Sequence, residues 1–515
     1  MRVTVRGKTV KIIECESPVS AEQVLRESGV DFSMPCGGNH TCGKCRIRVN
    51  GTASEMTAEE KKLLGEAEEN ERLACFVMLT GDCEIITGGA KTEIMTEGFR
   101  SDYGFDPIGE GYGIAVDIGT TTVAVYLYDL KTGSLKGKEA FSNPQAVFGG
   151  DVISRIEESL AGKGKELKET VTAGIAKAAE TVCKRAGVPA DLCRTAVITG
   201  NTTMLYLFLG KDVACLSAAP FKIEDYLGRF TGETELSEKI RLNIYLPRTM
   251  SAFVGSDITC ALVSAADIMK GEKASLLIDI GTNGEMAVIK DGRIFCCSTA
   301  AGPAFEGAGI HMGCMAVPGA VNRVTAENGR IEYTTIAGEK PCGICGSGII
   351  DAVAAFVLTG LIDETGCIAG EDTAYSGYVT ELDGQPAVRI GDSGIVLTQK
   401  DVRAVQLAKA AIRAGVESLL DACGETADGI GKLVLAGGFG SYIDIKSAAG
   451  IGLIPRELAD KTVAVGNAAG MGAVSVLLSR KAMEYSDEIS GKAVTLELST
   501  SEFFMDKYVE HMMFM

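Results

Sequence analysis

The 515-residue sequence is poor in several features that mark particular classes of protein. It has no tryptophan and only three histidines, which argues against a histidine-rich metal centre. It has no uninterrupted apolar run of about 18 residues, so no membrane-spanning helix is expected, and its first residues show no hydrophobic signal core. Lys and Arg number 50 against 68 Asp and Glu, and the net charge of −18 argues against binding to nucleic acid or to an anionic membrane. We therefore expect a cytoplasmic protein.

Cysteine, in contrast, is abundant, and four cysteines near the amino terminus form the most informative pattern. Seventeen cysteines without an export signal indicate reduced thiols and a metal site rather than a disulfide framework. Cys36, Cys42 and Cys45 form a C-x5-C-x2-C run in a glycine-rich loop, and Cys75 ends the segment Arg72–Cys75. A [2Fe–2S] cluster needs four thiolates and a close approach of the backbone, which glycine permits. These four cysteines are the expected cluster ligands, and a zinc site built from the same thiols is the alternative.

The chain is long enough for several domains, and its pattern changes twice. Residues 1–90 have strands, a helix, the cysteine loop and further strands in an order that resembles the β-grasp fold of ferredoxins. Residues 91–110 have no clear periodicity and contain glycine and proline, so we expect a linker. Residues 111–515 alternate long apolar runs with helical patterns and close with a strand and a helix from about residue 490, which indicates sheets covered on both faces.

Two similar glycine motifs lie in this second region. Val116–Thr120 and Ile278–Thr282 share the order apolar-Asp-Ile-Gly-Thr and lie about 160 residues apart, which predicts two similar α/β halves with a cleft between them. In each motif glycine allows a tight turn, the backbone N–H groups can bind phosphate oxygens, and Asp can hold Mg²⁺ through water. A third turn, Gly437–Gly440, would let the backbone approach an adenosine. The alternative is ordinary strand-to-loop turns that need glycine only for steric reasons.

These turns, in this order, resemble the superfamily of sugar kinases, heat-shock ATPases and actin. The resemblance implies a two-lobed ATPase that binds ATP and Mg²⁺. The nucleotide-binding residues that it implies are Gly119, Thr120, Thr121, Gly281, Thr282, Asn283, Gly284, Gly437, Gly438, Phe439 and Gly440. The candidate catalytic carboxylates are Asp117, Asp279, Glu285 and Glu306. The two glutamates would orient the attacking water, and a helix-capping or solvated carboxylate is the alternative for each.

The chain as a whole resembles the reductive activators of corrinoid proteins, which fuse a [2Fe–2S] domain to this ATPase fold. Matching stretches include Gly149–Arg155, Gly200–Met204, Phe253–Asp257 and Ala301–Gly307. The resemblance implies ATP-dependent reduction of Co(II) to Co(I) in a corrinoid protein of a methyltransferase system. It also implies an upstream electron donor, and it leaves a homodimer open. The chain departs from the family pattern in its short linker and in having no cysteine after Cys423.

Three other functions stay open at this point. An ATP-driven electron donor to another low-potential enzyme, as in the activators of 2-hydroxyacyl dehydratases, would carry a [4Fe–4S] cluster between subunits. A sugar-kinase-like phosphotransferase with a redox domain would phosphorylate polyols, and a non-catalytic regulator would bind nucleotide without hydrolysing it. Cys342 and Cys345 form a further C-x2-C pair, which we interpret as a turn and helix start rather than as a redox pair or half of a metal site.

Overall fold

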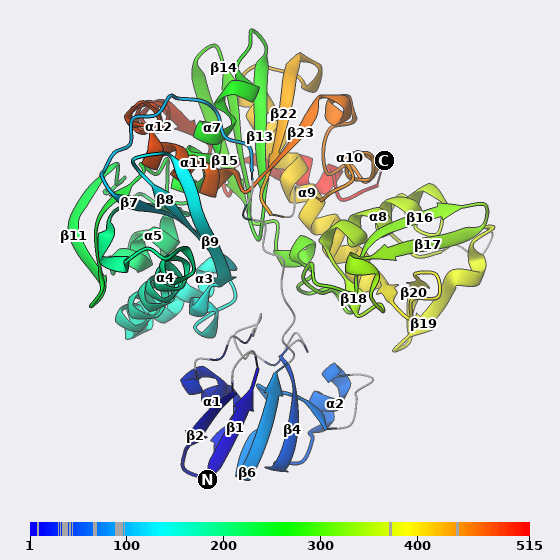
Figure 1. Cartoon of the computed structure of the whole chain (residues 1–515). Coiled ribbons are helices and arrows are strands. Elements are labelled where there is room, and N and C mark those ends of the chain that lie inside the picture. The colour runs from blue at the N-terminus through cyan, green and yellow to red at the C-terminus, as the bar shows by residue number, and fades with distance from the viewer. Residues whose placement is uncertain are drawn as a thin grey trace. The chain divides into compact units, whose positions relative to one another are not determined.

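The computed structural model describes the chain except for a few short segments, and it divides into two compact units. The residues that it does not describe are 8–9, 29, 31, 33–39, 41–42, 44, 65–69, 88–95, 97, 370–372, 439–441 and 515, together with the side chain of Arg26. The smaller unit comprises Met1–Lys91 and Pro144–Glu158, and the larger comprises Thr92–Asn143 and Ser159–Met515 (Figure 1). Each unit is described by itself below.

The smaller unit contains a mixed sheet in which the strands are ordered β2-β1-β6-β4-β5, with β3 beside β6. Side chains alternate across the sheet, so Val3 and Val5 of β1 are buried in one core with Ile47 of β4 and Val24 of α1. The elements from residue 1 to 91 are β1 (Arg2–Arg6), β2 (Val10–Glu14), β3 (Val19–Ser20), α1 (Ala21–Ser28), β4 (Arg46–Ala53), α2 (Ala58–Leu64), β5 (Glu71–Leu73) and β6 (Met78–Thr87). The remaining helix of this unit is α3 (Val152–Glu158).

The larger unit contains two six-stranded sheets with related topologies. Their strand orders are β11-β12-β10-β7-β8-β9 and β23-β22-β13-β14-β15-β24. In each sheet three consecutive antiparallel strands form a meander. Two further parallel strands are added beside the first strand of the meander: β10 and then β12 beside β7 in one sheet, and β22 and then β23 beside β13 in the other. The β7–β8 and β13–β14 hairpins are therefore equivalent, which explains the repeated motif in the sequence.

The strands of these sheets are short and largely apolar. The first sheet consists of β7 (Tyr112–Ile118), β8 (Thr122–Asp129), β9 (Ser134–Ser142), β10 (Cys193–Gly200), β11 (Arg229–Ser237) and β12 (Ile240–Leu246). The second consists of β13 (Ala274–Ile280), β14 (Gly284–Lys290), β15 (Arg293–Thr299), β22 (Ile430–Ala436), β23 (Thr462–Gly466) and β24 (Ala493–Thr495). Because β7, β13 and β22 are covered on both faces, they read as continuous apolar runs rather than as alternating ones.

Helices cover both sheets, and two of them cross at close range. A Cβ atom on Gly472 of α11 would lie 1.9 Å from the carbonyl oxygen of Cys260 in α7, so only glycine permits this approach. Residues of α7 and α11 join both sheets in one buried core. The helices of this unit are α4 (Gly164–Ala186), α5 (Thr202–Leu209), α6 (Ala214–Ser217), α7 (Ser256–Met269), α8 (Gly346–Leu358), α9 (Gln399–Ala422), α10 (Ile445–Gly450), α11 (Ala468–Leu478), α12 (Arg480–Lys492) and α13 (Glu502–Glu510).

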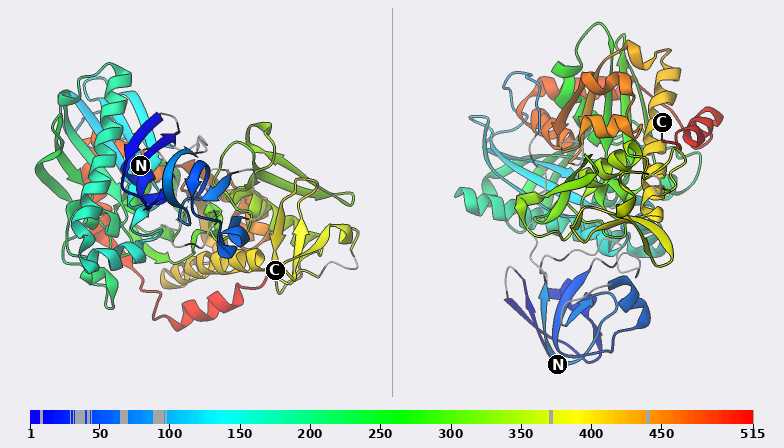
Figure 2. Two further views of the ribbon diagram at one scale, coloured as in Figure 1. Left: turned by 90° about the horizontal axis from the view of Figure 1, so that it is seen from below. Right: turned by 90° about the vertical axis from the view of Figure 1, so that its right-hand side faces the viewer.

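Two small three-stranded sheets complete the larger unit. They are ordered β17-β16-β18 and β19-β20-β21, and β16 packs against α8. Their strands are β16 (Ala320–Glu327), β17 (Arg330–Thr335), β18 (Gly343–Ile344), β19 (Val379–Leu382), β20 (Gln385–Arg389) and β21 (Val396–Thr398). The terminal helix α13 lies along α9 (Figure 2).

The described part of the range 91–110, expected as a linker, is bonded into the larger unit from Gly98 onward. Gly98 forms a bridge with Gly466, and the backbone N–H of Ser101 donates to the carbonyl of Ser264 in α7 at 2.9 Å. A Cβ atom on Gly98 would lie 2.7 Å from the carbonyl oxygen of Val465, so the chain passes this strand at contact distance. These contacts anchor the segment that leads into β7.

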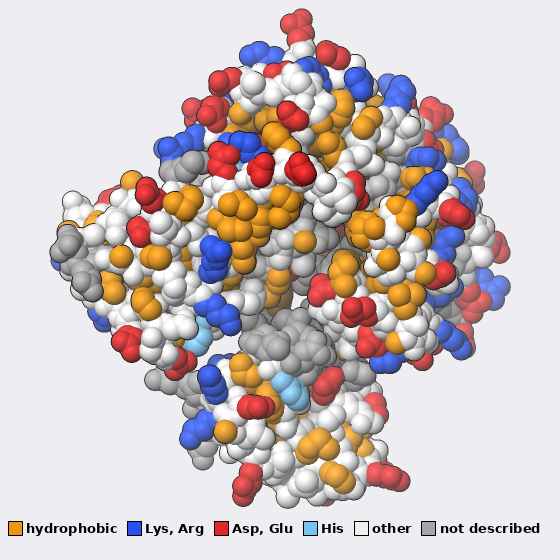
Figure 3. All heavy atoms as spheres, turned by 180° about the vertical axis from the view of Figure 1, so that it is seen from behind, with side chains coloured by type: hydrophobic (Ala, Val, Ile, Leu, Met, Phe, Trp, Pro, Cys, Tyr) orange, Lys and Arg blue, Asp and Glu red, His pale blue; other side chains and the backbone are white. Residues whose placement is uncertain are grey.

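Acidic and basic side chains are mixed over the larger unit on the face that Figure 3 shows, without a basic patch among them. Within the described residues, no helix is both long enough and apolar enough to span a bilayer.

Candidate functional site

The first glycine turn joins β7 to β8. The backbone N–H of Gly119 donates to the carbonyl of Thr122 at 2.9 Å, and a Cβ atom at this position would lie 2.7 Å from the same oxygen. Glycine is therefore required for the turn to close. Asp117, the last residue but one of β7, lies opposite Ala124, and Thr120 and Thr121 form the tip of the turn. The expected phosphate-binding residues are thus presented together at one end of the first sheet.

The second glycine turn joins β13 to β14 in the same way. The backbone N–H of Gly281 donates to the carbonyl of Asn283 at 2.9 Å, and Asp279 lies opposite Glu285 across the hairpin. Thr282 lies at the tip. Gly284 begins β14, and a Cβ atom there would lie 2.9 Å from the side chain of Ile412 in α9, so glycine makes room for that side chain.

The third glycine turn lies directly against the second motif. Gly437 has a φ of +92°, and a Cβ atom there would lie 2.6 Å from a carboxylate oxygen of Asp279. Gly438 follows and is exposed, whereas Phe439 and Gly440 lie outside the described residues. The start of the expected adenosine turn is therefore adjacent to the second phosphate motif.

Glu306 connects the two phosphate turns. Its carboxylate accepts a hydrogen bond from the Thr121 hydroxyl and another from the Thr282 hydroxyl, each at 3.0 Å. Glu306 ends the short 3₁₀ helix Pro303–Glu306, and burial raises its pKa although both hydroxyls favour the charged form. The two turns, far apart in the sequence, thus converge on one carboxylate. This position differs from the helix-capping or solvated roles that were its alternatives.

Four further carboxylates lie close enough to disturb one another's ionisation. Burial raises the pKa of Asp117 and of Asp279 to about 7, and that of Asp257 to about 6. Burial, followed by the charges of Asp257 and Asp279, also raises the pKa of Glu285 well above its ordinary value. Such a cluster is costly when fully charged and would be stabilised by a divalent cation.

The sequence motifs identified three of these four carboxylates as site residues and missed Asp257. Asp257 lies in the first turn of α7, and its charge raises the pKa of Asp117, Asp279 and Glu285 alike. Its stretch, Phe253–Asp257, was recognised only as part of a family resemblance. The signal that could have found it is an acidic residue directly after Gly255-Ser256 at a helix start.

Two asparagines also belong to the site and were not predicted. Asn201 caps α5 by accepting from the N–H of Met204, and its side-chain amide donates to the Thr120 hydroxyl at 3.1 Å. Asn467 caps α11 and hydrogen-bonds Asp117, which partly opposes the rise in the pKa of Asp117. Both residues fasten a helix start to the first phosphate motif. Helix-capping asparagines are common, so the sequence alone does not distinguish these two.

The cysteine site in the smaller unit is described for two of its four predicted ligands. The sulfurs of Cys45 and Cys75 lie 3.3 Å apart, and the N–H of Ala74 donates to the carbonyl of Cys45 at 2.8 Å. Two sulfurs bound to one tetrahedral ion lie ~3.8 Å apart, so this pair is close to that arrangement. Cys36 and Cys42 lie outside the described residues. The structure thus brings together the two cysteines that are distant in the sequence.

A buried ion pair positions β5, the strand that leads to Cys75. The Arg72 guanidinium makes two parallel contacts with the Glu60 carboxylate, at 2.9 and 2.8 Å, and also donates to the carbonyl of Ser54. Glu60, on α2, is fully buried and additionally accepts from the N–H of Leu73. The Arg72–Cys75 segment is therefore fixed to α2 by a bidentate pair and to the residue after β4 by a further hydrogen bond.

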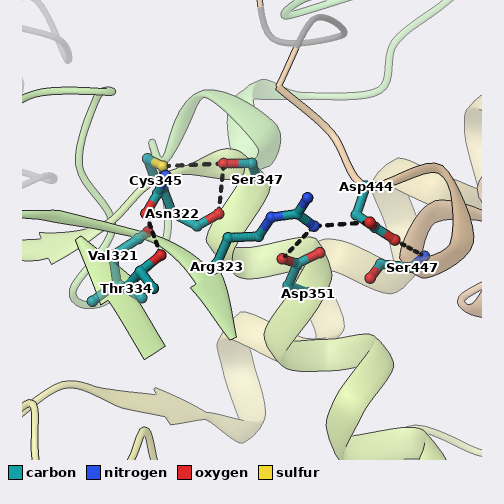
Figure 4. A network of polar contacts seen from close by, with 9 residues as sticks. All are labelled: Val321, Asn322, Arg323, Thr334, Cys345, Ser347, Asp351, Asp444 and Ser447. Carbon is teal, nitrogen blue, oxygen red and sulfur yellow. Dashed lines mark hydrogen bonds and ion pairs between the residues drawn. The ribbon is translucent and has the colours of Figure 1, made fainter. Parts of the chain in front are cut away.

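Cys342 and Cys345 do not face each other. Cys345 immediately precedes α8 and is buried, where its thiol donates to the carbonyl of Val321 at 3.4 Å (Figure 4). Cys342 is exposed and contacts the carbonyl of Pro318 at 3.6 Å instead. This geometry agrees with a turn and helix start for the C-x2-C pair.

The same close-up shows an ion-pair network beside α8. Arg323 of β16 contacts the carboxylates of Asp444 at 2.8 Å and Asp351 at 3.5 Å (Figure 4). Asp444 also caps α10 by accepting from the N–H of Ser447. Arg323 therefore joins the small β17-β16-β18 sheet to the helix that follows the third glycine turn.

Comparison with known families matches nearly the whole chain. A model of the 2Fe-2S iron-sulfur cluster binding domain matches residues 3–80. The RACo middle region matches residues 112–270, and the C-terminal ASKHA domain of RACo matches residues 273–515. A corrinoid activation enzyme, RamQ of Eubacterium limosum, is 37% identical over 421 residues, which cover 78% of this chain and 70% of that protein. The chain belongs to the RACo family.

Other relatives agree with this assignment. The [Co(II) methylated amine-specific corrinoid protein] reductase of Methanosarcina barkeri is 27% identical over 434 residues, which cover 77% of this chain and 76% of that protein. The solved structure of a reductive activator for corrinoid, iron-sulfur protein matches with a TM-score of 0.71 and 28% identity, over 100% of this chain and 98% of that one. The expected fold, a ferredoxin-like domain followed by an actin-like and sugar-kinase-like part, is confirmed for this RACo-family protein.

Proposed function

We propose that this RACo-family protein reduces the Co(II) of a corrinoid protein to Co(I) by one electron, in a reaction that depends on ATP. The observation that carries the proposal is the union, in one chain, of a ferredoxin-like domain with paired cysteine sulfurs and a second part whose two phosphate turns meet at Glu306. The 37% identical relative is a corrinoid activation enzyme, which supports a corrinoid protein as the partner.

The cysteines would hold a [2Fe–2S] cluster through Cys36, Cys42, Cys45 and Cys75. The 3.3 Å spacing of Cys45 and Cys75 fits two thiolates directed at one metal centre, and the domain match favours iron–sulfur over zinc. When bound, such a cluster supplies a one-electron carrier of low potential. The chain's own contribution, within the described residues, is to hold the Arg72–Cys75 segment in place through the buried Glu60–Arg72 pair.

The second part would bind ATP and Mg²⁺ between its two phosphate turns. The N–H groups and hydroxyls of Thr120, Thr121, Thr282 and Asn283 would contact the phosphates, and Gly437 opens the turn that would receive the adenosine. The clustered carboxylates fit a divalent cation, because burial, followed by the charge of neighbouring carboxylates, raises the pKa of Asp117 and of Asp279 to about 7. We assign Asp117 and Asp279, supported by Asp257, to the cation. Glu285 and Glu306 are the candidates to orient the attacking water.

ATP is needed in this scheme because the acceptor lies at a lower potential than the electron donor. Each ~60 mV of a one-electron gap corresponds to about 1.4 kcal/mol. Nucleotide can make the transfer favourable only through a conformation that binds the Co(II) corrinoid protein with different affinity, since a ligand shifts an equilibrium by its differential affinity. An activator of 2-hydroxyacyl dehydratases would need a [4Fe–4S] cluster instead, and the match to a 2Fe-2S domain favours the corrinoid reaction.

The deciding experiment mixes the purified protein, a Co(II) corrinoid protein, a chemical reductant and MgATP under anaerobic conditions. The Co(I) absorbance band should appear with ATP and stay absent without it. Asp279→Ala should keep the visible spectrum of the cluster and lose the activation. Equal Co(I) formation without ATP, full activity of Asp279→Ala, or an iron-free purified protein would each contradict the proposal.

A further inference from the structure

Two cysteines outside the proposed cluster and nucleotide sites lie against each other at the surface of the larger unit. Cys314 is half-buried and Cys342 is exposed. A Cβ atom on Gly343 would lie 2.7 Å from the Cys314 sulfur, so this sulfur lies over the backbone next to Cys342. The two segments run side by side, since the N–H of Cys314 donates to the carbonyl of Ile344 at 2.8 Å.

The environment favours reaction at Cys342. The Cys314 thiol donates a hydrogen bond to the Cys342 sulfur and lowers the pKa of Cys342 to about 7. A thiol with such a pKa is about half thiolate at neutral pH, far more than an ordinary cysteine, and the thiolate is the nucleophile in exchange with disulfides. Cys183 and Cys193 form the contrasting pair: their sulfurs lie 3.6 Å apart, but both side chains are buried and closed to a reagent.

The pair is connected to the phosphate turns through a short segment. A Cβ atom on Gly307, the residue after Glu306, would lie 2.4 Å from the carbonyl oxygen of Cys314, so the backbone of Cys314 packs directly on the residue beside Glu306. The Glu306 carboxylate accepts hydrogen bonds from the hydroxyls of Thr121 and Thr282. A triphosphate that takes the same hydroxyls would be repelled by this carboxylate, so Glu306 must shift when nucleotide binds.

We propose that Cys314 and Cys342 form a reversible disulfide that holds the Glu306 segment in place and weakens ATP binding. The oxidant is a low-molecular-weight disulfide. The Cys342 thiolate attacks one of its sulfurs, which forms a mixed disulfide and releases one thiolate. Cys314 then loses its proton and attacks the Cys342 sulfur, which releases the second thiolate. The two protein thiols are oxidised to one disulfide, and the reagent is reduced by two electrons to two thiols.

The first test is mass mapping of the full-length holoprotein. Reduced protein, freed of reductant under anaerobic conditions, is treated with glutathione disulfide, its free thiols are blocked with N-ethylmaleimide, and the unreduced digest is analysed. We expect a Cys314–Cys342 link that dithiothreitol removes. Cys342→Ser should abolish the link, and Cys367→Ser, at an exposed thiol that accepts from Thr365 at 3.3 Å, should leave it unchanged. The absence of the link in wild-type protein, or a Cys342–Cys345 link in its place, would overturn the proposal.

The second test measures MgATP affinity by titration calorimetry, and this step rests on the proposed nucleotide site. The oxidised protein should bind ATP at least tenfold more weakly, dithiothreitol should restore the affinity, and Cys342→Ser should not respond to the oxidant. Equal affinity of the fully linked and the reduced protein would overturn the coupling. If the reduced protein bound no ATP, the proposed function would fail, while the mass map would still decide whether the disulfide forms.

Discussion

The carboxylates beside the two glycine turns are the residues whose charge most affects the stability of the proposed site. Asp117, Asp257 and Asp279 are brought together with Glu285 at the ends of strands and at one helix start, where the three aspartates are half-buried and Glu285 is buried. Their raised pKa values mean that it is unfavourable for all of these carboxyl groups to be ionised when no cation is bound. Under the proposed function, the carboxylate cluster would lower the stability of the ligand-free protein and provide the ligands for a cation that binds with the nucleotide.

Asp279→Asn should stabilise the cation-free protein above neutral pH. Asp279 has a pKa of about 7 in the folded state and about 3.9 in the unfolded chain, so its contribution to the free energy of unfolding is complete below pH 4 and is lost as the pH rises through 7. We expect the variant to gain roughly 2 kcal/mol at pH 8 in EDTA, seen as a melting temperature about 4 °C higher, and the gain should shrink toward pH 4.

The control for this prediction is Asp460→Asn, at an exposed position, which should change the melting temperature by less than about 1 °C. A gain for Asp279→Asn that was independent of pH, or a loss of stability at pH 8, would show that the Asp279 carboxylate is not destabilised in the fold.

The variant Glu306→Gln should affect MgATP binding and ATP hydrolysis in different ways. The variant keeps an oxygen acceptor for one of the two threonine hydroxyls but loses the negative charge, so MgATP should bind at least as tightly as to the wild type. If Glu306 orients the attacking water, phosphate release should fall at least tenfold. Titration calorimetry and steady-state phosphate release measure the two effects, with the exposed Glu327→Gln as the control. Unchanged turnover would assign the water-orienting role to another group.

The residues that sequence analysis found are those with local signatures. Asp117 and Asp279 stand in repeated strand-to-turn motifs, so their positions followed from the pattern alone. Asp257 and Asn467 act on these residues from helix starts that are distant in the sequence, and the partner of Cys342 is Cys314 rather than the nearby Cys345. Contacts of this kind depend on how helices and sheets pack, which no short motif records.

At the scale of elements, the sequence predicted the repeated hairpins, but it did not predict the conformation of a segment that packs against distant elements. The β7–β8 and β13–β14 hairpins carry the same sequence motif and occupy equivalent places in their sheets. The segment from Gly98 to Pro107, which has no periodicity of its own, is fixed by hydrogen bonds to distant elements, such as that of the Ser101 hydroxyl to the carbonyl of Ser264. Its conformation is therefore determined by its surroundings rather than by local propensity.

The ion pair that attaches β5 to α2 should contribute strongly to the thermal stability of the cysteine site. Arg72→Ala would leave the buried Glu60 carboxylate without its partner, at a cost of roughly 3–5 kcal/mol. The visible absorbance of the cluster should then be lost at a clearly lower temperature. Arg6→Ala is the matched control, because Arg6 pairs with Glu84 at 2.7 Å on the exposed side of the same sheet and such pairs contribute below about 1 kcal/mol. Equal losses for both variants would show that burial of the pair has no effect.

At the scale of the whole molecule, the proposed cluster site and the proposed nucleotide site belong to different compact units. The predicted cluster ligands lie in the smaller unit, and the phosphate turns and the carboxylates around them lie in the larger one. A nucleotide that does not contact the cluster changes its potential only weakly, because charge effects are screened by salt over about 10 Å. Under the proposed function, nucleotide energy would then be expressed in affinity for the corrinoid partner.

This argument predicts that MgATP leaves the reduction potential of the cluster unchanged. Dye-mediated titration of the holoprotein, followed by electron paramagnetic resonance, should give the same midpoint within about 20 mV with and without MgATP, a difference of less than ~0.5 kcal/mol. In the same preparation, the affinity for the Co(II) corrinoid protein should change with MgATP, and Asp279→Ala should remove that change. A drop of the midpoint by 100 mV or more on adding MgATP would show instead that nucleotide acts on the electron donor, and the affinity mechanism would then be wrong.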